Sequence, residues 1–303
     1  AYPPEGHFVA ETQEIFDKWE HEMSKNPLGD PRCNGGKPYP SHLLDKSKLQ
    51  YEVGPDENIV FMDADTDEVT GFAFHGLLND PALLKVLNGT VVDHLNKVKK
   101  TLRDNDPGYL VGVGYTSGSR GARALAWTNN LKKEVSATEK RQHAYKMSAL
   151  FAHIWSHAKR AMPKEILDDF ENATMELGGL RMDGGVRGQG DGVLRYTIVV
   201  DGEERHFETS DLSPPAALCG INYGRHIHNE NNHNKYCLKY ITCRTHSQEY
   251  GAGFFNAEYG IYIPSLEDQL AGWRGKDLHG TGYAKNDPYD QDPPFKQIGV
   301  AFI

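Results

Sequence analysis

Apolar positions in the first half of the chain repeat with the period of an α-helix. From Leu83 to Leu102 they recur three or four residues apart, which is the spacing of one helix face. Asp80-Pro81 supplies an N-cap and a proline at the first helical position. The SATE sequence of Ser136–Glu139 is a capping box and predicts a second helix to about Arg160. A third helix is predicted between Pro163 and the Gly178-Gly179 pair.

From Gly192 onward the pattern changes to short apolar runs about ten residues apart. The run GVLRYTIVVDGEERHFET predicts a β-hairpin around Asp201-Gly202. Further runs, each followed by turn residues, are ALCGINYGRHIH, KYCLKYITC, GFFNAEYGIYIP, QLAGWRG and QIGVAFI. Short strands at this regular spacing are typical of a β-sandwich or jelly roll.

The two patterns together predict an α+β fold with a C-terminal jelly roll supported by N-terminal helices. Residues 1–57 are rich in Pro, Gly and charge, and we interpret them as an arm wrapped on the domain, with an amphipathic stretch near Glu11–Met23. Residues 58–303 are expected to form one domain. Its parts are a hairpin over Asn58–Phe74 and supporting helices (58–180), followed by the jelly-roll core (192–303).

Composition limits the classes of partner. The chain has 303 residues and a formal net charge of −9. Proteins that bind phosphate backbones need a basic face, so this charge argues against nucleic acid as a partner. No run of about 18 apolar residues occurs, and no membrane-spanning helix is predicted. The expected substrate is therefore a small molecule or a modified macromolecule.

The cysteines and sequons do not decide the compartment. Four cysteines in 303 residues are too few for a disulfide scaffold, and none forms a Cys-x-x-Cys pair of the zinc-ribbon kind. Glycosylation tripeptides begin at Asn88 and Asn172, and the chain starts at Ala1 rather than at Met. Secretion after cleavage of a leader is compatible with these features.

The stretch GRHIHNENNHNKY holds the main candidate chemistry. In a strand, residues two apart face the same side, so His226, His228 and Glu230 would project together. Fifty-one residues after His228, a short apolar run is followed by His279. Two ligands two positions apart and a third from a distant strand form a two-His-one-carboxylate arrangement, which leaves one face of a ferrous ion open.

Other polar clusters are not predicted to hold a metal or a phosphate. The run Asp63–Asp67 begins like a calcium loop, but Glu68 and Phe74 stand where Gly and Glu are required. Gly114–Gly121 lacks the Lys-Ser/Thr ending of a phosphate loop, and we interpret it as a loop facing the substrate. Packing or surface roles are predicted for the histidines of the helical half, His143, His153 and His157.

The segment Ala217–Ile303 resembles the 2-oxoglutarate/Fe(II) dioxygenases. Their pattern is His-x-Asp/Glu, a distal His some fifty or more residues later, and then a basic residue. The most specific part of the resemblance is the run from the turn Gly251–Gly253 through EYGIYIP and QLAGWRGKDLHGT to IGVAF. The rest of the chain is weakly similar to fungal members related to nucleic-acid base oxygenases, and no substrate is inferred from them.

The resemblance implies a double-stranded β-helix in which His228, Glu230 and His279 bind Fe(II) and Lys296 binds 2-oxoglutarate. It also implies hydroxylation or demethylation of a substrate, with release of succinate and CO2. Use of 2-oxoglutarate favours an intracellular location. The family mostly has Asp at the position of Glu230 and Arg at that of Lys296.

A second family matches the same residues differently. Gly220 followed after five residues by His226-Ile-His228 matches the start of the cupin motif, in which His226, His228 and His279 would be the ligands. A jelly roll that holds no metal and binds a partner is the non-enzymatic alternative. Supporting roles are expected around the ligands. They are second-shell contacts from Arg225, Asn231 and Asn232, and either co-substrate binding or packing by Tyr223 and Tyr240.

Overall fold

Eight consecutive strands near the C-terminus form two facing four-stranded sheets. They are β10 (Ala216–Ile221), β11 (Arg225–His228), β12 (Tyr236–Arg244), β13 (Phe254–Asn256), β14 (Ile261–Ile263), β15 (Gln269–Arg274), β16 (His279–Thr281) and β17 (Gln297–Phe302). The strand orders are β10-β17-β12-β15 and β11-β16-β13-β14, and each neighbouring pair is antiparallel. This is the topology of a double-stranded β-helix, so the predicted α+β class and jelly roll are confirmed.

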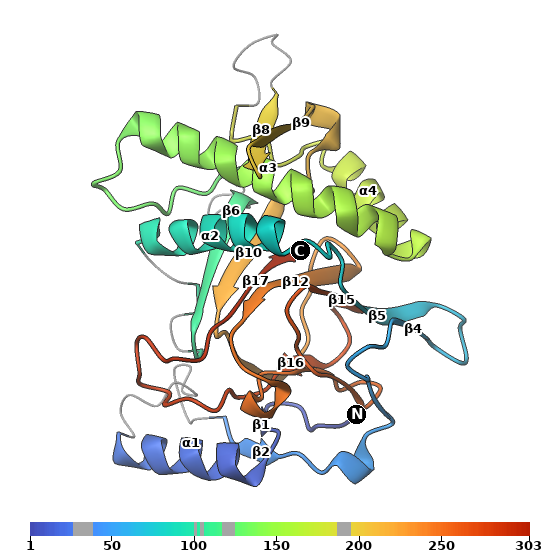
Figure 1. The fold of residues 1–303 in the computed structure, drawn as a ribbon. Coiled ribbons are helices and arrows are strands. Elements are labelled where there is room, and N and C mark those ends of the chain that lie inside the picture. The colour runs from blue at the N-terminus through green and yellow to red at the C-terminus, as the bar shows by residue number, and fades with distance from the viewer. Residues whose placement is uncertain (27–38, 100–101, 104–105, 117–124, 187–194) are drawn as a thin grey trace.

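This computed structural model describes residues 1–26, 39–99, 102–103, 106–116, 125–186 and 195–303 (Figure 1). Strands from the N-terminal half extend both sheets. The predicted hairpin is β4 (Ile59–Met62) and β5 (Val69–His75), which joins the larger sheet beside β15. On the other edge, β6 (Tyr109–Thr116) pairs with β10 and with β7 (Ala126–Trp127). The smaller sheet gains β3 (Tyr51–Glu52) beside β14.

The hairpin predicted around Asp201-Gly202 is present but lies outside the jelly roll. It consists of β8 (Tyr196–Val200) and β9 (Glu203–Phe207), which pair only with each other among the described strands. The hairpin packs on helix α3, at the far end of the molecule from the arm (Figure 1). The strands of the jelly roll therefore begin at β10 and not at residue 192.

Three helices lie on one side of the larger sheet, as Figure 1 shows: α2 (Pro81–Lys97), α3 (Ala137–Ala161) and α4 (Lys164–Glu176). The side chain of Asp80 caps α2 and Ser136 with Glu139 forms the capping box of α3, as predicted. Helix α2 ends before Leu102. Among the described residues, no helix is long and apolar enough to cross a bilayer.

The side chains of β12 point alternately into two different apolar cores. Tyr236, Leu238 and Tyr240 are fully buried in the large core between the sheet and the helices. Cys237, one position on, belongs to a smaller core between the two sheets, together with Phe254 and Trp273. Side chains of a strand point alternately to its two faces, so Lys239 also projects between the sheets.

The N-terminal arm covers the other side of the molecule, over the smaller sheet (Figure 1). It contains β1 (Phe8–Ala10), α1 (Gln13–Lys25), β2 (Ser41–Leu43) and a 3-10 turn at Lys46–Lys48. The hydroxyl of Thr12 caps α1. Val9 and Leu44 of the arm pack against Phe255 and Tyr262 on the outer face of the smaller sheet.

Candidate metal centre

The three predicted ligands come together at one end of two neighbouring strands. His228 is the last residue of β11, His279 is the first residue of β16, and the two are paired across the antiparallel ladder. Glu230 follows two residues after His228. One donor atom from each of the three side chains lies within 4.8 Å of the others, and this is the one such group found among the described residues.

Backbone carbonyls fix the tautomer of both imidazoles. Nδ1 of His228 lies 2.8 Å from the carbonyl oxygen of His226, and Nδ1 of His279 lies 2.8 Å from that of Asp277. A carbonyl oxygen only accepts hydrogen bonds, so each Nδ1 must carry the proton. In the neutral rings the lone pair is therefore on Nε2. Such second-shell bonds are the usual way in which proteins orient metal-binding histidines.

Glu230 is held in its ionised form. Burial by itself would raise its pKa, but a hydrogen bond from His228 when that ring is protonated, together with the hydrogen bond and charge of Arg103, holds the pKa well below the usual range. Arg103 Nη2 donates to Oε1 over 2.5 Å, and the backbone N–H of Glu230 donates to the carbonyl of Gly275 over 2.7 Å. Charge-assisted bonds of this kind are stronger than neutral ones and fix the carboxylate in place.

The donor set fits a divalent transition metal. Burial, together with the charge of His228, lowers the pKa of His279 to about 4, so its ring is neutral near pH 7. Nε2 of His228 and Oε1 of Glu230 are 3.3 Å apart. An imidazole lone pair and a carboxylate oxygen repel each other at this distance unless a cation, either a proton or a metal ion, lies between them. Two imidazoles and one carboxylate are a known ligand set for Fe(II), with coordination positions left open.

A hydrogen-bond network extends from Glu230 to residues that no motif indicated. Arg103 Nη1 donates to the hydroxyl of Tyr223 over 3.3 Å, and this hydroxyl donates to Oδ2 of Asp106 over 2.5 Å. Arg225 donates to the same oxygen over 2.7 Å. Tyr223 and Arg225 are therefore connected to Glu230 through Arg103 and Asp106. Arg103 and Asp106 lie more than a hundred residues before their partners, so only the fold could place them.

The other residues expected near the ligands lie in different surroundings. The ring of His226 is buried and stacks on Tyr39 with centroids 3.8 Å apart, so His226 is not a member of the three-residue group. Asn232 donates to the sulfur of Cys237 over 3.0 Å, and Asn231 is exposed. The hydroxyl of Tyr240 donates to Asp268 over 2.7 Å, on the side of β12 that faces the helices.

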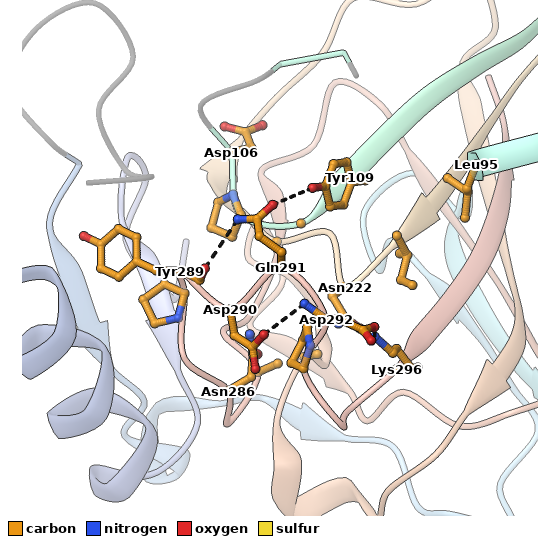
Figure 2. A pocket seen from close by; sticks show the side chains of 18 of the residues that line it. Leu95, Asp106, Tyr109, Asn222, Asn286, Tyr289, Asp290, Gln291, Asp292 and Lys296 are labelled. Atoms are coloured by element: carbon orange, nitrogen blue, oxygen red, sulfur yellow. Dashed lines mark hydrogen bonds and ion pairs between the residues drawn. The ribbon is translucent and has the colours of Figure 1, made fainter. Parts of the chain in front are cut away.

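Lys296 lies just before β17 and its ammonium group pairs with Asp292. Both side chains line a cavity of about 910 Å³ between α2 and the connection from β16 to β17 (Figure 2). Tyr109 and Gln291 are hydrogen-bonded across this cavity over 2.8 Å. Asp106 also lines it, which connects the cavity to the network that reaches Glu230. The three candidate ligands themselves do not line it.

Lys239 was not singled out from the sequence, although a lysine inside an apolar strand is an unusual signal. Burial lowers its pKa to about 7. Its Nζ lies 4.6 Å from the ring centroid of Phe254 and 3.5 Å from Oγ of Ser265. The Phe254 ring is in turn stacked 6.0 Å from the ring of His279. Lys239 is thus separated from the candidate metal centre by one aromatic ring.

Comparison with known proteins gives little. No family model matches the chain, and no curated protein matches it. Among solved structures, one described as "NgTET1 in complex with 5mC DNA" aligns over 96% of this chain and 88% of that chain, with 10% sequence identity and a TM-score of 0.49. A likeness at this level says nothing about activity or substrate.

Proposed function

We propose that this chain is a non-haem Fe(II) oxygenase that uses 2-oxoglutarate and O2 to hydroxylate or demethylate an organic substrate. The observation that supports it best is the contact between His228 Nε2 and Glu230 Oε1 at 3.3 Å, because Nδ1 of the same ring already donates to a carbonyl. A lone pair on Nε2 and the carboxylate oxygen repel each other at this distance unless a cation lies between them. The resemblance of Ala217–Ile303 to the 2-oxoglutarate dioxygenases supplies the choice of Fe(II) and co-substrate.

In this proposal the protein's residues have separate tasks. His228, Glu230 and His279 would hold the metal, and Arg103 would keep the carboxylate of Glu230 oriented and ionised. When bound, Fe(II) with 2-oxoglutarate and O2 would supply the oxidising power. The alternative cupin ligand set needs His226, whose stacking on Tyr39 favours the carboxylate set.

Two lysines are candidates for binding the distal carboxylate of 2-oxoglutarate. The resemblance indicates Lys296, which pairs with Asp292 beside the large cavity. The position of Lys239 between the sheets indicates this residue instead. No carboxylate is within ion-pair distance of Lys239 among the described residues, and a buried ammonium without one is costly. A bound carboxylate would supply the missing charge.

Metal analysis and co-substrate titration test the proposal. We expect about one iron per chain after anaerobic loading, and a weak visible absorption band when 2-oxoglutarate is added. Incubation with O2 should then release succinate. Absence of iron binding, or of any effect of 2-oxoglutarate on the iron-loaded protein, would contradict it. Iron binding without 2-oxoglutarate binding would favour a cupin-like or non-catalytic site.

The variants Lys239→Met and Lys296→Met decide between the two lysines. Loss of a charge-assisted hydrogen bond worth about 1.5–3 kcal/mol should weaken 2-oxoglutarate binding by about 10- to 150-fold in one variant. The other variant serves as its control, and both should keep their iron. Unchanged affinity in both would exclude both lysines as the anchor.

A further inference from the structure

The N-terminal arm is hydrogen-bonded to β11, which carries His228, and to the segment that follows β16. Next to His228, the N–H of Ile227 donates to the carbonyl of His7 over 2.9 Å, and the N–H of Gly6 donates to the carbonyl of Ile227 over 2.8 Å. Past the end of β16, the N–H of Tyr283 donates to the carbonyl of Val9 over 2.8 Å. Strand β1 and the two residues before it thus bridge β11 and the segment that follows β16.

Aromatic packing reinforces this bridge. The Phe8 ring of β1 stacks on Tyr283 with centroids 5.3 Å apart and meets His226 edge-on at 5.5 Å. The carbonyl of His226 is the acceptor that fixes the tautomer of His228. The position of β1 therefore bears directly on the backbone group that orients a candidate ligand.

A single buried carboxylate fastens the arm to the smaller sheet directly after β1. Glu11 accepts hydrogen bonds from the hydroxyl of Tyr262 and, over 2.6 Å, from the N–H of Gly253. Burial raises its pKa, and these two bonds oppose the rise. No cation lies within ion-pair distance of Glu11 among the described residues. Such a carboxylate is stable only if its hydrogen bonds are kept.

Two glycines shape the socket that receives this carboxylate. A β-carbon at Gly253 or at Gly282 would lie 2.9 Å from Oε1 of Glu11, closer than real β-carbons approach other atoms. At Gly282 it would also come within 3.3 Å of Val9 and Phe255. The smaller sheet therefore has a recess just before β13 and just after β16, and the Glu11 side chain of the arm fills it.

We propose that Glu11 is a positioning residue for the candidate metal centre, because its docking in the Gly253/Gly282 socket holds β1 against β11 and thereby fixes His228. This inference rests on the proposed metal site. Removing the carboxylate would loosen β1 and, with it, the hydrogen bonds that the preceding residues Gly6 and His7 make with Ile227, and would let the His226 carbonyl move. The metal would then bind to a less ordered pair of histidines.

The test uses Co(II) as a spectroscopic probe, with Glu11→Gln and Gly282→Ala as two independent ways to disturb the socket. Mutation of residues that orient metal ligands without binding the metal typically lowers metal affinity 10- to 100-fold. We expect a loss in that range for both variants. The visible Co(II) spectrum should change, and hydrogen exchange at the Ile227 amide should become faster. Thr12→Ala is the matched control, since it removes the cap of α1 and leaves the socket intact.

The inference fails if Glu11→Gln lowers the melting temperature as Thr12→Ala does but leaves the Co(II) affinity, the spectrum and Ile227 exchange unchanged. In that case Glu11 has a structural role only. Wild-type protein that binds no Co(II) would overturn the proposed metal centre itself, and with it this role. A wild type that binds Co(II) normally, with indifferent variants, would overturn the role of Glu11 alone.

Discussion

Two histidine-rich regions of the molecule differ in what surrounds the rings. At the ends of β11 and β16, both candidate ligands have Nδ1 bound to a carbonyl, and their other nitrogens share a space with the Glu230 carboxylate. Between α2 and α3, Nδ1 of His94 meets Nε2 of His143 at 2.8 Å, and the two rings stack. There one nitrogen of each ring is hydrogen-bonded to the other histidine.

A third pair shows that spacing alone does not make a metal site. His153 and His157 are one helical turn apart, with ring centroids 5.0 Å apart, but no third ligand group joins them among the described residues. His153 is buried in the core, as predicted for this histidine. Asp93 lies 3.7 Å from Nδ1 of His143, so a carboxylate by itself is not the difference either. At β11 and β16, one donor atom of each of the three side chains lies within 4.8 Å of the others, and a carbonyl fixes each ring.

The largest expected effect is loss of metal binding in His279→Ala. The variant removes one of three ligands, so affinity should fall by more than the roughly 100-fold known for outer-shell changes. His143→Ala is the control from the other region and should retain full metal binding. Elemental analysis after Fe(II) loading measures both, with circular dichroism to check the fold. Normal iron content in His279→Ala would exclude this residue as a ligand.

The variants Glu230→Ala and His226→Ala test which of these two residues binds the metal together with His228 and His279. We expect Glu230→Ala to lose the metal, because the oxygen near His228 disappears. His226→Ala should lose less than tenfold in affinity, since its ring stacks on Tyr39 outside the donor group. Titration of Fe(II) into each variant measures the two affinities. The reverse result would establish the three-His set in place of the carboxylate set.

The buried histidine His153 of the helical region should make the protein less stable at acidic pH. Burial, together with the charge of His157, lowers the pKa of His153 from 6.5 to about 4. Between pH 6.5 and about pH 4, His153 is protonated in the unfolded chain and neutral in the folded chain. The free energy of unfolding should therefore fall with falling pH, by about 1.4 kcal/mol per pH unit for this residue.

His153→Leu tests this origin of acid sensitivity. Both ring nitrogens of His153 are buried and have no hydrogen-bond partner among the residues that the structure describes, so an apolar replacement should be neutral or stabilising at pH 7. The slope of stability between pH 6 and pH 4.5, measured by urea unfolding, should become shallower. An unchanged slope would mean that other groups cause the acid sensitivity.

The smallest effect is expected at His233, the third histidine of the asparagine-rich stretch. It is exposed and its Nε2 lies 3.3 Å from Glu176, a surface pair of little energetic value. His233→Ala should change stability by less than about 0.5 kcal/mol and leave metal affinity unchanged. A measurable drop in metal affinity would show that the candidate site extends beyond the three donors.

The sequence by itself indicated helices α2, α3 and α4, the strands of the jelly roll and three candidate donors. Helix caps at Asp80 and Ser136 act within one turn, and strand alternation acts between adjacent residues, so both can be read locally. The two-residue step from His228 to Glu230 is local in the same sense. The pairing with His279 could be anticipated only because a known family pattern has this spacing.

The tertiary structure alone decided the surroundings of these donors. Arg103, Lys239 and Glu11 reach the region from a loop, a strand of the facing sheet and the arm, and no sequence spacing relates them to it. The separation of His226 from His228 also required the fold, because it depends on Tyr39 and Phe8 from the arm. Contacts between distant segments depend on how sheets and arm pack together, and this packing is not encoded in the period of any single element.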